Sequence, residues 1–206
     1  MIFEGEYLNG TIWNGKCREY NNLNKLIFDG VYKNGEKIGK YYKYDSNGNL
    51  IFEGEYFKGK KNGKCKEYNS DGTLTFEGEY KNGERKNGKE YNNNVFVFEG
   101  EYLNGERNGK GKEFDYNGKL IFEGEYLNGE RNGKGKEYHY DACIFEGEYL
   151  KGKRLKGKEY DNKGKLIFEG EYLNGKRNGI VIEYDDNNNL MREIEYLNGI
   201  PKINGK

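Results

Sequence analysis

Hydrophobic and polar positions alternate with a short, regular period in this chain. The stretch FEGEYLNGERNGKGKEY opens with Phe122, Gly124 and Tyr126, which are separated from one another by glutamates. A period of two predicts a β-strand with aromatic residues on one face and carboxylates on the other. The Asn-Gly pair that follows is typical of a tight turn, and KGKEY supplies a second short strand. Each such stretch therefore predicts one β-hairpin, with a further turn leading into the next copy.

The same phrase recurs along the whole chain. Nine copies, the last one degenerate, begin 22–25 residues apart, and such a period indicates a repeat architecture. A lone hairpin is marginally stable in water, so successive hairpins are expected to pair edge to edge. We predict an all-β fold, an elongated single-layer meander of stacked antiparallel β-hairpins, with residues 1–206 as one continuous array. The copies begin at Phe3, Phe28, Phe52, Phe76, Phe98, Phe122, Phe145, Phe168 and Arg192.

The recurring aromatic and glycine positions are predicted to be structural. A glycine on the aromatic face leaves space for a ring from a neighbouring unit. On the other face, glutamates are expected to lie across from lysines and to form cross-strand ion pairs. The positions assigned this structural role are Phe98, Gly100, Tyr102, Gly105, Gly109, Phe122, Gly124, Tyr126, Gly129, Gly133, Phe168, Gly170, Tyr172 and Gly175.

Some copies depart from the pattern. Tyr138 lies five residues after Gly133, which would place the two on opposite faces of a flat strand, so we expect a bulge or bend at the second glycine of GKGKEY. Copies 4 and 7, NGERKNGKEY and KGKRLKGKEY, are expected to lengthen the first turn by one residue. The last units carry the apolar run from Ile180 to Ile182 and Ile194 in a glycine position, which suits a cap or a dimer surface.

Composition excludes several classes of protein. The 35 basic and 35 acidic residues balance, so no nucleic-acid partner is expected. A mean hydropathy of -1.15 would suit a disordered chain, but 16% aromatic residues at regular positions indicate packing. No apolar run approaches the ~18 residues of a membrane span. Met1 is followed at once by a repeat, so we expect no signal peptide and a cytoplasmic location.

The spacing aromatic-x-Gly-x-aromatic-x-x-Gly, followed by further glycines, resembles the MORN repeat (membrane occupation and recognition nexus), including its variant form. The resemblance covers essentially the whole chain. It implies a non-enzymatic role in scaffolding, in assemblies peripheral to the membrane or cytoskeleton, and in protein contacts. It also implies binding of acidic phospholipids and homodimerisation through terminal repeats. An antitoxin-like or immunity-like role is a further alternative that the variant form resembles.

The sequence predicts no catalytic, metal or cofactor site, and we therefore expect no enzyme. GERKNGKE, from Gly83 to Glu90, has the glycine and lysine of a phosphate-binding loop but no final Ser or Thr. The stretches DSNGN and DDNNN loosely resemble calcium loops and are interpreted as turns. The single histidine, His139, is expected in a turn. The cysteines are expected to be small buried fillers at Cys17, Cys65 and Cys143.

One set of basic residues remains a candidate binding site. They follow the hairpin turns at regular intervals and would form a row along one edge, about 10 Å apart. Such a row can bind phosphate head groups, although Glu84, Glu106 and Glu130 would neutralise half of it. The favoured hypothesis is protein binding through an aromatic face with exposed Tyr and Phe anchors, and lipid binding is the alternative. The row consists of Lys61, Arg85, Arg107, Arg131, Arg154 and Arg177.

Overall fold

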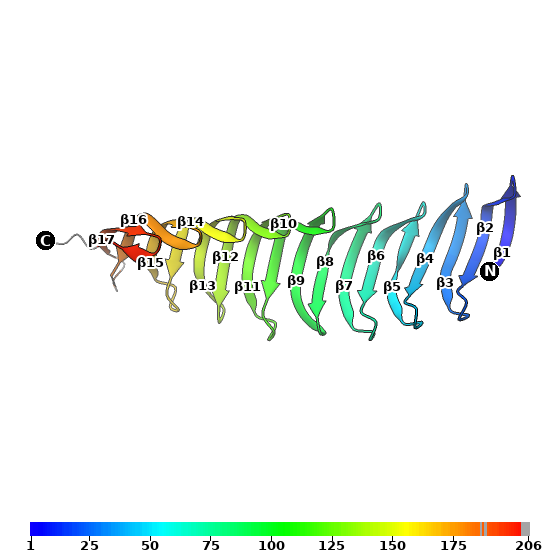
Figure 1. Ribbon diagram of the computed structural model, residues 1–206, viewed down its shortest axis with the longest axis horizontal. Helices are drawn as coiled ribbons and strands as arrows, with labels where there is room; N and C mark the ends of the chain where they lie inside the picture. Colours follow the sequence, from blue (N-terminus) through cyan, green and yellow to red (C-terminus); the bar gives the residue numbers. More distant parts are fainter. Residues whose placement is uncertain (186, 188, 203–206) are drawn as a thin grey trace. The chain divides into compact units, whose positions relative to one another are not determined.

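The computed structural model describes residues 1–185, 187 and 189–202 (Figure 1). These residues form β-strands and turns and contain no helix, as the alternating pattern predicted. The chain divides into two compact units, residues 1–105 and 106–206. Residues 203–206 of the predicted array lie outside the described residues, and the union of both units into one array stays a prediction.

The first unit is an antiparallel meander in which each strand pairs with the next one along the chain. Because all neighbours in the sheet are neighbours in sequence, the predicted single layer of hairpins is confirmed here. Its strands are β1 (Ile2–Leu8), β2 (Thr11–Tyr20), β3 (Leu26–Lys33), β4 (Glu36–Tyr44), β5 (Leu50–Phe57), β6 (Lys60–Tyr68), β7 (Leu74–Lys81), β8 (Glu84–Asn92) and β9 (Val95–Leu103).

The second unit repeats this arrangement. Consecutive strands again pair antiparallel, so each repeat contributes one hairpin. Its strands are β10 (Glu106–Phe114), β11 (Leu120–Leu127), β12 (Glu130–His139), β13 (Ala142–Leu150), β14 (Lys153–Tyr160), β15 (Leu166–Leu173), β16 (Lys176–Tyr184), β17 (Leu190–Leu197) and β18 (Ile200–Pro201).

The hairpin turns have two residues, both with positive φ. In the turn between β11 and β12, Asn128 has φ 51° and Gly129 has φ 82°. Positive φ at both positions characterises the type I′ turn, whose twist matches that of the strands it joins. The turn before β8 also has two residues, so the expected lengthening in copies 4 and 7 is wrong. In copy 4 Lys86 bulges from the strand instead, because the register shifts between the pairs Asn87–Glu79 and Arg85–Tyr80.

The second strand of the regular hairpin does bulge, but not where the sequence suggested. Gly135 pairs in register with Gly124, and the register shifts between this pair and the pair Tyr126–Arg131. The bulge therefore includes Gly133, the first glycine, whose φ of 76° is readily adopted only by glycine. The expectation of a bulge at the second glycine is wrong.

A small aromatic core lies on one face of each hairpin. The Phe122 ring is fully buried, and its tip would lie 2.7 Å from a Cβ at Gly124 and 2.6 Å from one at Gly135. Tyr126 and Tyr149 contact the ring edge to face, with centroids 5.6 and 5.2 Å away. The space at Gly124 is thus taken by the ring of its own strand and, equally close, by the backbone of the paired strand at Gly135, while Tyr149 of the next hairpin closes the side. We call this side of the sheet the aromatic face.

Candidate binding surfaces

The predicted basic row lies in the strands and not in the hairpin turns. Each of its members is the second residue of an even-numbered strand, β6 to β16. Arg131, for example, pairs in register with Tyr126 and so lies on the aromatic face. Each two-residue type I′ turn ends directly before the even-numbered strand begins. These side chains therefore lie on the sheet and not at its edge.

The arginines cover the aromatic rings. The Arg131 guanidinium carbon lies 4.0 Å from the centroid of the Phe122 ring, and Arg154 lies 4.3 Å from that of Phe145. Such cation–π contacts contribute about 0.5–2 kcal/mol each. Phe122 is therefore 0% exposed and Tyr126 only 4% exposed. The expectation of exposed aromatic anchors on this face is wrong, because a single-layer sheet needs those rings, and the cations above them, as its core.

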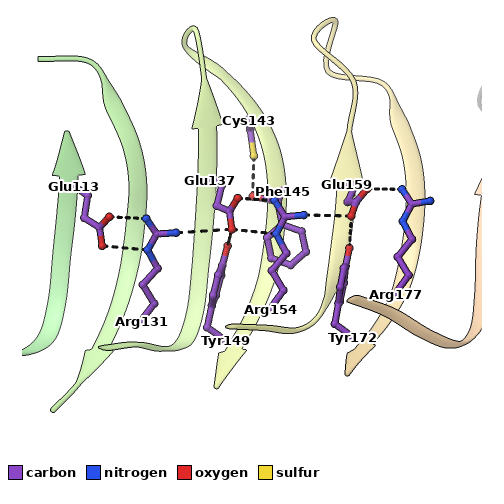
Figure 2. Close-up of polar contacts among 10 residues, drawn as sticks. All are labelled: Glu113, Arg131, Glu137, Cys143, Phe145, Tyr149, Arg154, Glu159, Tyr172 and Arg177. Carbon is purple, nitrogen blue, oxygen red and sulfur yellow. Dashed lines mark hydrogen bonds and ion pairs between the residues drawn. The ribbon is translucent and has the colours of Figure 1, made fainter. Parts of the chain in front are cut away.

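A glutamate one hairpin earlier in the chain binds each of these arginines. Glu113 accepts hydrogen bonds from Arg131 at 3.1 Å (Nε to Oε1) and 2.5 Å (Nη2 to Oε2). It also accepts one from the Tyr126 hydroxyl at 2.6 Å. Figure 2 shows the same arrangement recurring along successive hairpins. We call this set the glutamate–arginine ladder: Glu113, Arg131, Glu137, Arg154, Glu159 and Arg177.

Two arginines of the ladder, Arg131 and Arg154, also approach the glutamate of their own hairpin. The Arg154 guanidinium lies 3.2 Å from Glu159, besides binding Glu137. Arg131 likewise lies 3.9 Å from Glu137. Charges therefore alternate along this part of the aromatic face, and both of these cations are shared between two carboxylates.

These partners differ from the ones that the sequence suggested. Glu130 is the first residue of β12 and pairs in register with Leu127, so its exposed side chain lies on the face opposite to Arg131. The carboxylates that bind the arginines belong instead to the KEY and KEF segments, at Glu67, Glu113, Glu137 and Glu159. Sequence reasoning missed them because they lie about 18 residues before their partners.

The ladder favours the ionised form of two of its glutamates, Glu113 and Glu137. Burial would raise the pKa of the Glu113 carboxyl, but hydrogen bonds from Arg131 and Tyr126 outweigh it and hold the pKa below its ordinary value. The pKa of Glu137 is lowered in the same way, with Arg154 and Tyr149 as donors against burial. Since the arginine charges are compensated, an anionic membrane gains little from them, and phosphate binding by the basic row stays a prediction.

The opposite face carries a second, more exposed set of polar contacts. Tyr138, near the end of β12, donates a hydrogen bond to Glu123 at 2.6 Å. Lys136 lies 3.2 Å from Glu146, and Lys112 lies 3.6 Å from Glu123. Cross-strand glutamate–lysine pairs were predicted for this face. Exposed pairs of this kind contribute only about 0–1 kcal/mol each.

A row of half-exposed leucines runs along this opposite face, beside the hairpin turns. In the second unit each is the last residue of an odd-numbered strand and is 46–55% exposed. Sequence reasoning missed it, although the leucine that follows the FEGEY phrases starting at Phe122, Phe145 and Phe168 was the available signal. We call it the leucine row: Leu127, Leu150, Leu173 and Leu197.

The other motifs lie in strands and turns. Gly83 to Glu90 covers a turn residue and most of β8, and no helix follows as a phosphate-binding loop requires. Asp45 accepts hydrogen bonds from the backbone N–H groups of Asn47 and Asn49 in its own turn. In DDNNN, residues 186 and 188 lie outside the described residues.

The single histidine and the cysteines form no common cluster. His139 is exposed at the end of β12. Cys17 and Cys65 are buried, as predicted, whereas Cys143 is only half-buried. Within the described part of the chain, no three His, Cys, Asp or Glu residues are grouped so that they could hold a metal ion.

The fold defines a β-hairpin repeat protein. The family model described as "MORN repeat variant" matches residues 37–58, 61–82, 107–128, 155–174 and 177–198. The model described as "MORN repeat" matches residues 122–143. The chain belongs to the MORN repeat family. No curated protein is similar enough to count as a relative. Among the described residues, no helix has the length and apolar character needed to cross a membrane.

Proposed function

We propose that this chain is a non-enzymatic cytoplasmic scaffold that binds another protein through the leucine row. The observation that carries the proposal is the regular exposure of Leu127, Leu150 and Leu173, one per hairpin, on a face that also carries the glutamate–lysine pairs. The hairpins place them about 10 Å apart. Apolar patches rimmed by polar residues are typical of protein interaction sites.

The residues around the leucine row favour a protein over a membrane. Leu127 pairs in register with Glu130, while Leu150 pairs with Lys153. The rim of the row thus carries both signs of charge, whereas attraction to anionic lipid grows with uncompensated positive charge. The experiment must distinguish protein binding through the leucine row from the alternative, lipid binding through the basic row.

The test uses the chain's own repeats as a guide. Lys33 and Lys81 occupy the position of the leucine row in two repeats, so lysine is compatible with the fold there. A triple variant, Leu127→Lys, Leu150→Lys and Leu173→Lys, should lose the bound protein in affinity capture. The control Glu130→Lys, which also adds positive charge, should retain it.

Flotation with acidic vesicles completes the experiment. If the chain binds a protein through the leucine row, the wild type should not float with the vesicles at physiological salt. Affinity capture of the bound protein should depend on the leucines. Salt-sensitive flotation of the wild type, strengthened in both lysine variants, would support the lipid alternative. Capture that is identical for the wild type and the triple variant would refute the role of the leucine row.

A further inference from the structure

The pattern of carboxylates on the aromatic face is broken once in the first unit. Lys43 pairs in register with Phe52, just as Glu113 pairs with Phe122 in the second unit. In the first unit the equivalent position is Glu19 in β2 and Glu67 in β6. A cation therefore stands where the neighbouring repeats have the carboxylate that binds the next hairpin.

The donors that would bind this carboxylate are still present. Tyr56 and Lys61 pair in register on the next hairpin, as Tyr126 and Arg131 do. Among the described residues, no side chain accepts a hydrogen bond from the Tyr56 hydroxyl. The nearest carboxylate to the Lys61 ammonium is that of its own hairpin, Glu67, at 3.8 Å.

The repeat before the break shows what these donors do when the carboxylate is there. Glu19 accepts hydrogen bonds from the Tyr32 hydroxyl at 3.0 Å and from the Lys37 ammonium at 2.6 Å. Burial would lower the pKa of Lys37, but Glu19 outweighs it and the pKa is raised. At Lys61 burial prevails, helped by the charge of Lys43, and the pKa is lowered.

The surroundings limit what can fill the gap. Tyr41 replaces a glycine of the regular repeat, and its ring lies 4.4 Å from that of Tyr56, centroid to centroid. The Lys61 ammonium lies 3.9 Å from the centroid of the Phe52 ring. The donors are thus held against aromatic rings, and carboxylates of the adjacent hairpins stand on both sides. A single oxyanion fits this pattern of charge better than an extended anionic surface does.

We propose that the gap at Lys43 binds one carboxylate supplied by another molecule, with Tyr56, Lys61 and Lys43 as its donors. The bound group takes the role that Glu113 has in the second unit, accepting from a tyrosine hydroxyl and from the cation over the phenylalanine ring. The source is an acidic side chain of a partner polypeptide. That choice of source rests on the proposed function, while the carboxylate site itself does not.

The first measurement is a titration with sodium acetate against sodium chloride at equal ionic strength. NMR resonances of the Lys61 ammonium and of the Tyr56 ring report on the site directly. Acetate should shift both in a saturable way, and it should raise the pKa of Lys61. Equal shifts with chloride, or shifts that never saturate, would overturn the site.

A repair variant provides the sharpest comparison. Lys43→Glu restores the built-in carboxylate, so it should raise the thermal midpoint and the pKa of Lys61, and should weaken acetate binding by about tenfold or more. Tyr56→Phe removes one donor and should weaken acetate binding by about threefold to tenfold. If acetate binds the Lys43→Glu variant as well as it binds the wild type, the proposal is wrong.

The matched control makes the same lysine-to-glutamate change at a position beside the site. Lys60→Glu lies one residue from Lys61 on the other face, and Glu106 and Glu130 show that glutamate suits this position. This variant should keep the acetate response. If the Lys60→Glu variant loses the acetate response, acetate binding depends on net charge alone, and the proposal is contradicted.

A final arm identifies the source and separates this inference from the proposed function. A hexaglutamate peptide should bind more tightly than acetate, while hexaglutamine should not bind. Hexaglutamate binding no tighter than acetate would overturn the polypeptide source and leave a small free carboxylate. Because the leucine row belongs to the second unit and this site to the first, the triple lysine variant described above should still bind acetate, so the two hypotheses can fail separately.

Discussion

Glu137 joins two consecutive hairpins of the second unit. It accepts a hydrogen bond from the Tyr149 hydroxyl at 2.7 Å and one from Arg154 Nε at 3.0 Å, both from the following hairpin. It also lies 3.9 Å from Arg131 of its own hairpin. Since each hairpin alone has little apolar surface, this carboxylate is a main point of attachment between repeats.

Replacing this carboxylate should therefore destabilise the protein. Glu137→Gln leaves two partly buried guanidinium groups without their shared anion, and we expect a loss of about 2–3 kcal/mol in the free energy of unfolding. Urea denaturation followed by circular dichroism measures it. The control, Glu148→Gln, removes an exposed carboxylate from the opposite face and should change the free energy by less than about 0.5 kcal/mol. Equal effects of the two variants would contradict the role of the ladder.

Acid should weaken the protein through the same carboxylates. The pKa values of Glu113 and Glu137 are lowered in the folded chain, so their stabilising effect is complete above the ordinary glutamate pKa, near 4.3. It is lost progressively as pH falls below about 5 and through the lowered folded values. The free energy of unfolding should drop over this range. The drop should be smaller in Glu137→Gln, and an unchanged pH profile in that variant would contradict the assignment.

The close pairing of backbones at the glycines should tolerate no side chain. A Cβ at Gly147 would lie 2.2 Å from the Lys156 carbonyl oxygen and 2.7 Å from the tip of the Phe145 ring. We expect Gly147→Ala to cost about 3 kcal/mol, since the backbone of the paired strand cannot move aside. Gly129→Ala is the comparison, because its Cβ would meet nothing within 4 Å and only the positive φ opposes it, at about 1–2 kcal/mol. Thermal denaturation of both variants ranks the two costs, and the reverse order would refute close packing at Gly147.

The three thiols should differ in reactivity. Cys17 and Cys65 are 2% and 4% exposed, whereas Cys143 is half-buried, and burial raises the pKa of each thiol. Titration of the native protein with a chromogenic disulfide reagent should therefore show one thiol reacting before the other two. Denaturation should expose all three. Cys143→Ser should abolish the faster phase, and its persistence would show that one of the buried thiols is accessible.

The sequence alone determined the repeating unit of this protein. Period-two alternation in FEGEY predicted the strands, and the Asn-Gly pairs predicted the two-residue turns, because both signals depend on backbone geometry within a few residues. The hairpin meander followed from them. The burial of Cys17 and Cys65 could also be predicted, since both occupy a glycine position on the aromatic face.

Only the tertiary structure decided what the charged residues do. Arg131 and Glu113 are 18 residues apart, and they meet because the bulge at Gly133 and the register of β10, β11 and β12 bring them to one face. A repeat pattern cannot reveal such a pairing, since every copy offers several glutamates at similar distances. The same register buries Phe122 beneath Arg131, so a row that looks like an exposed basic edge in the sequence covers the core in the fold.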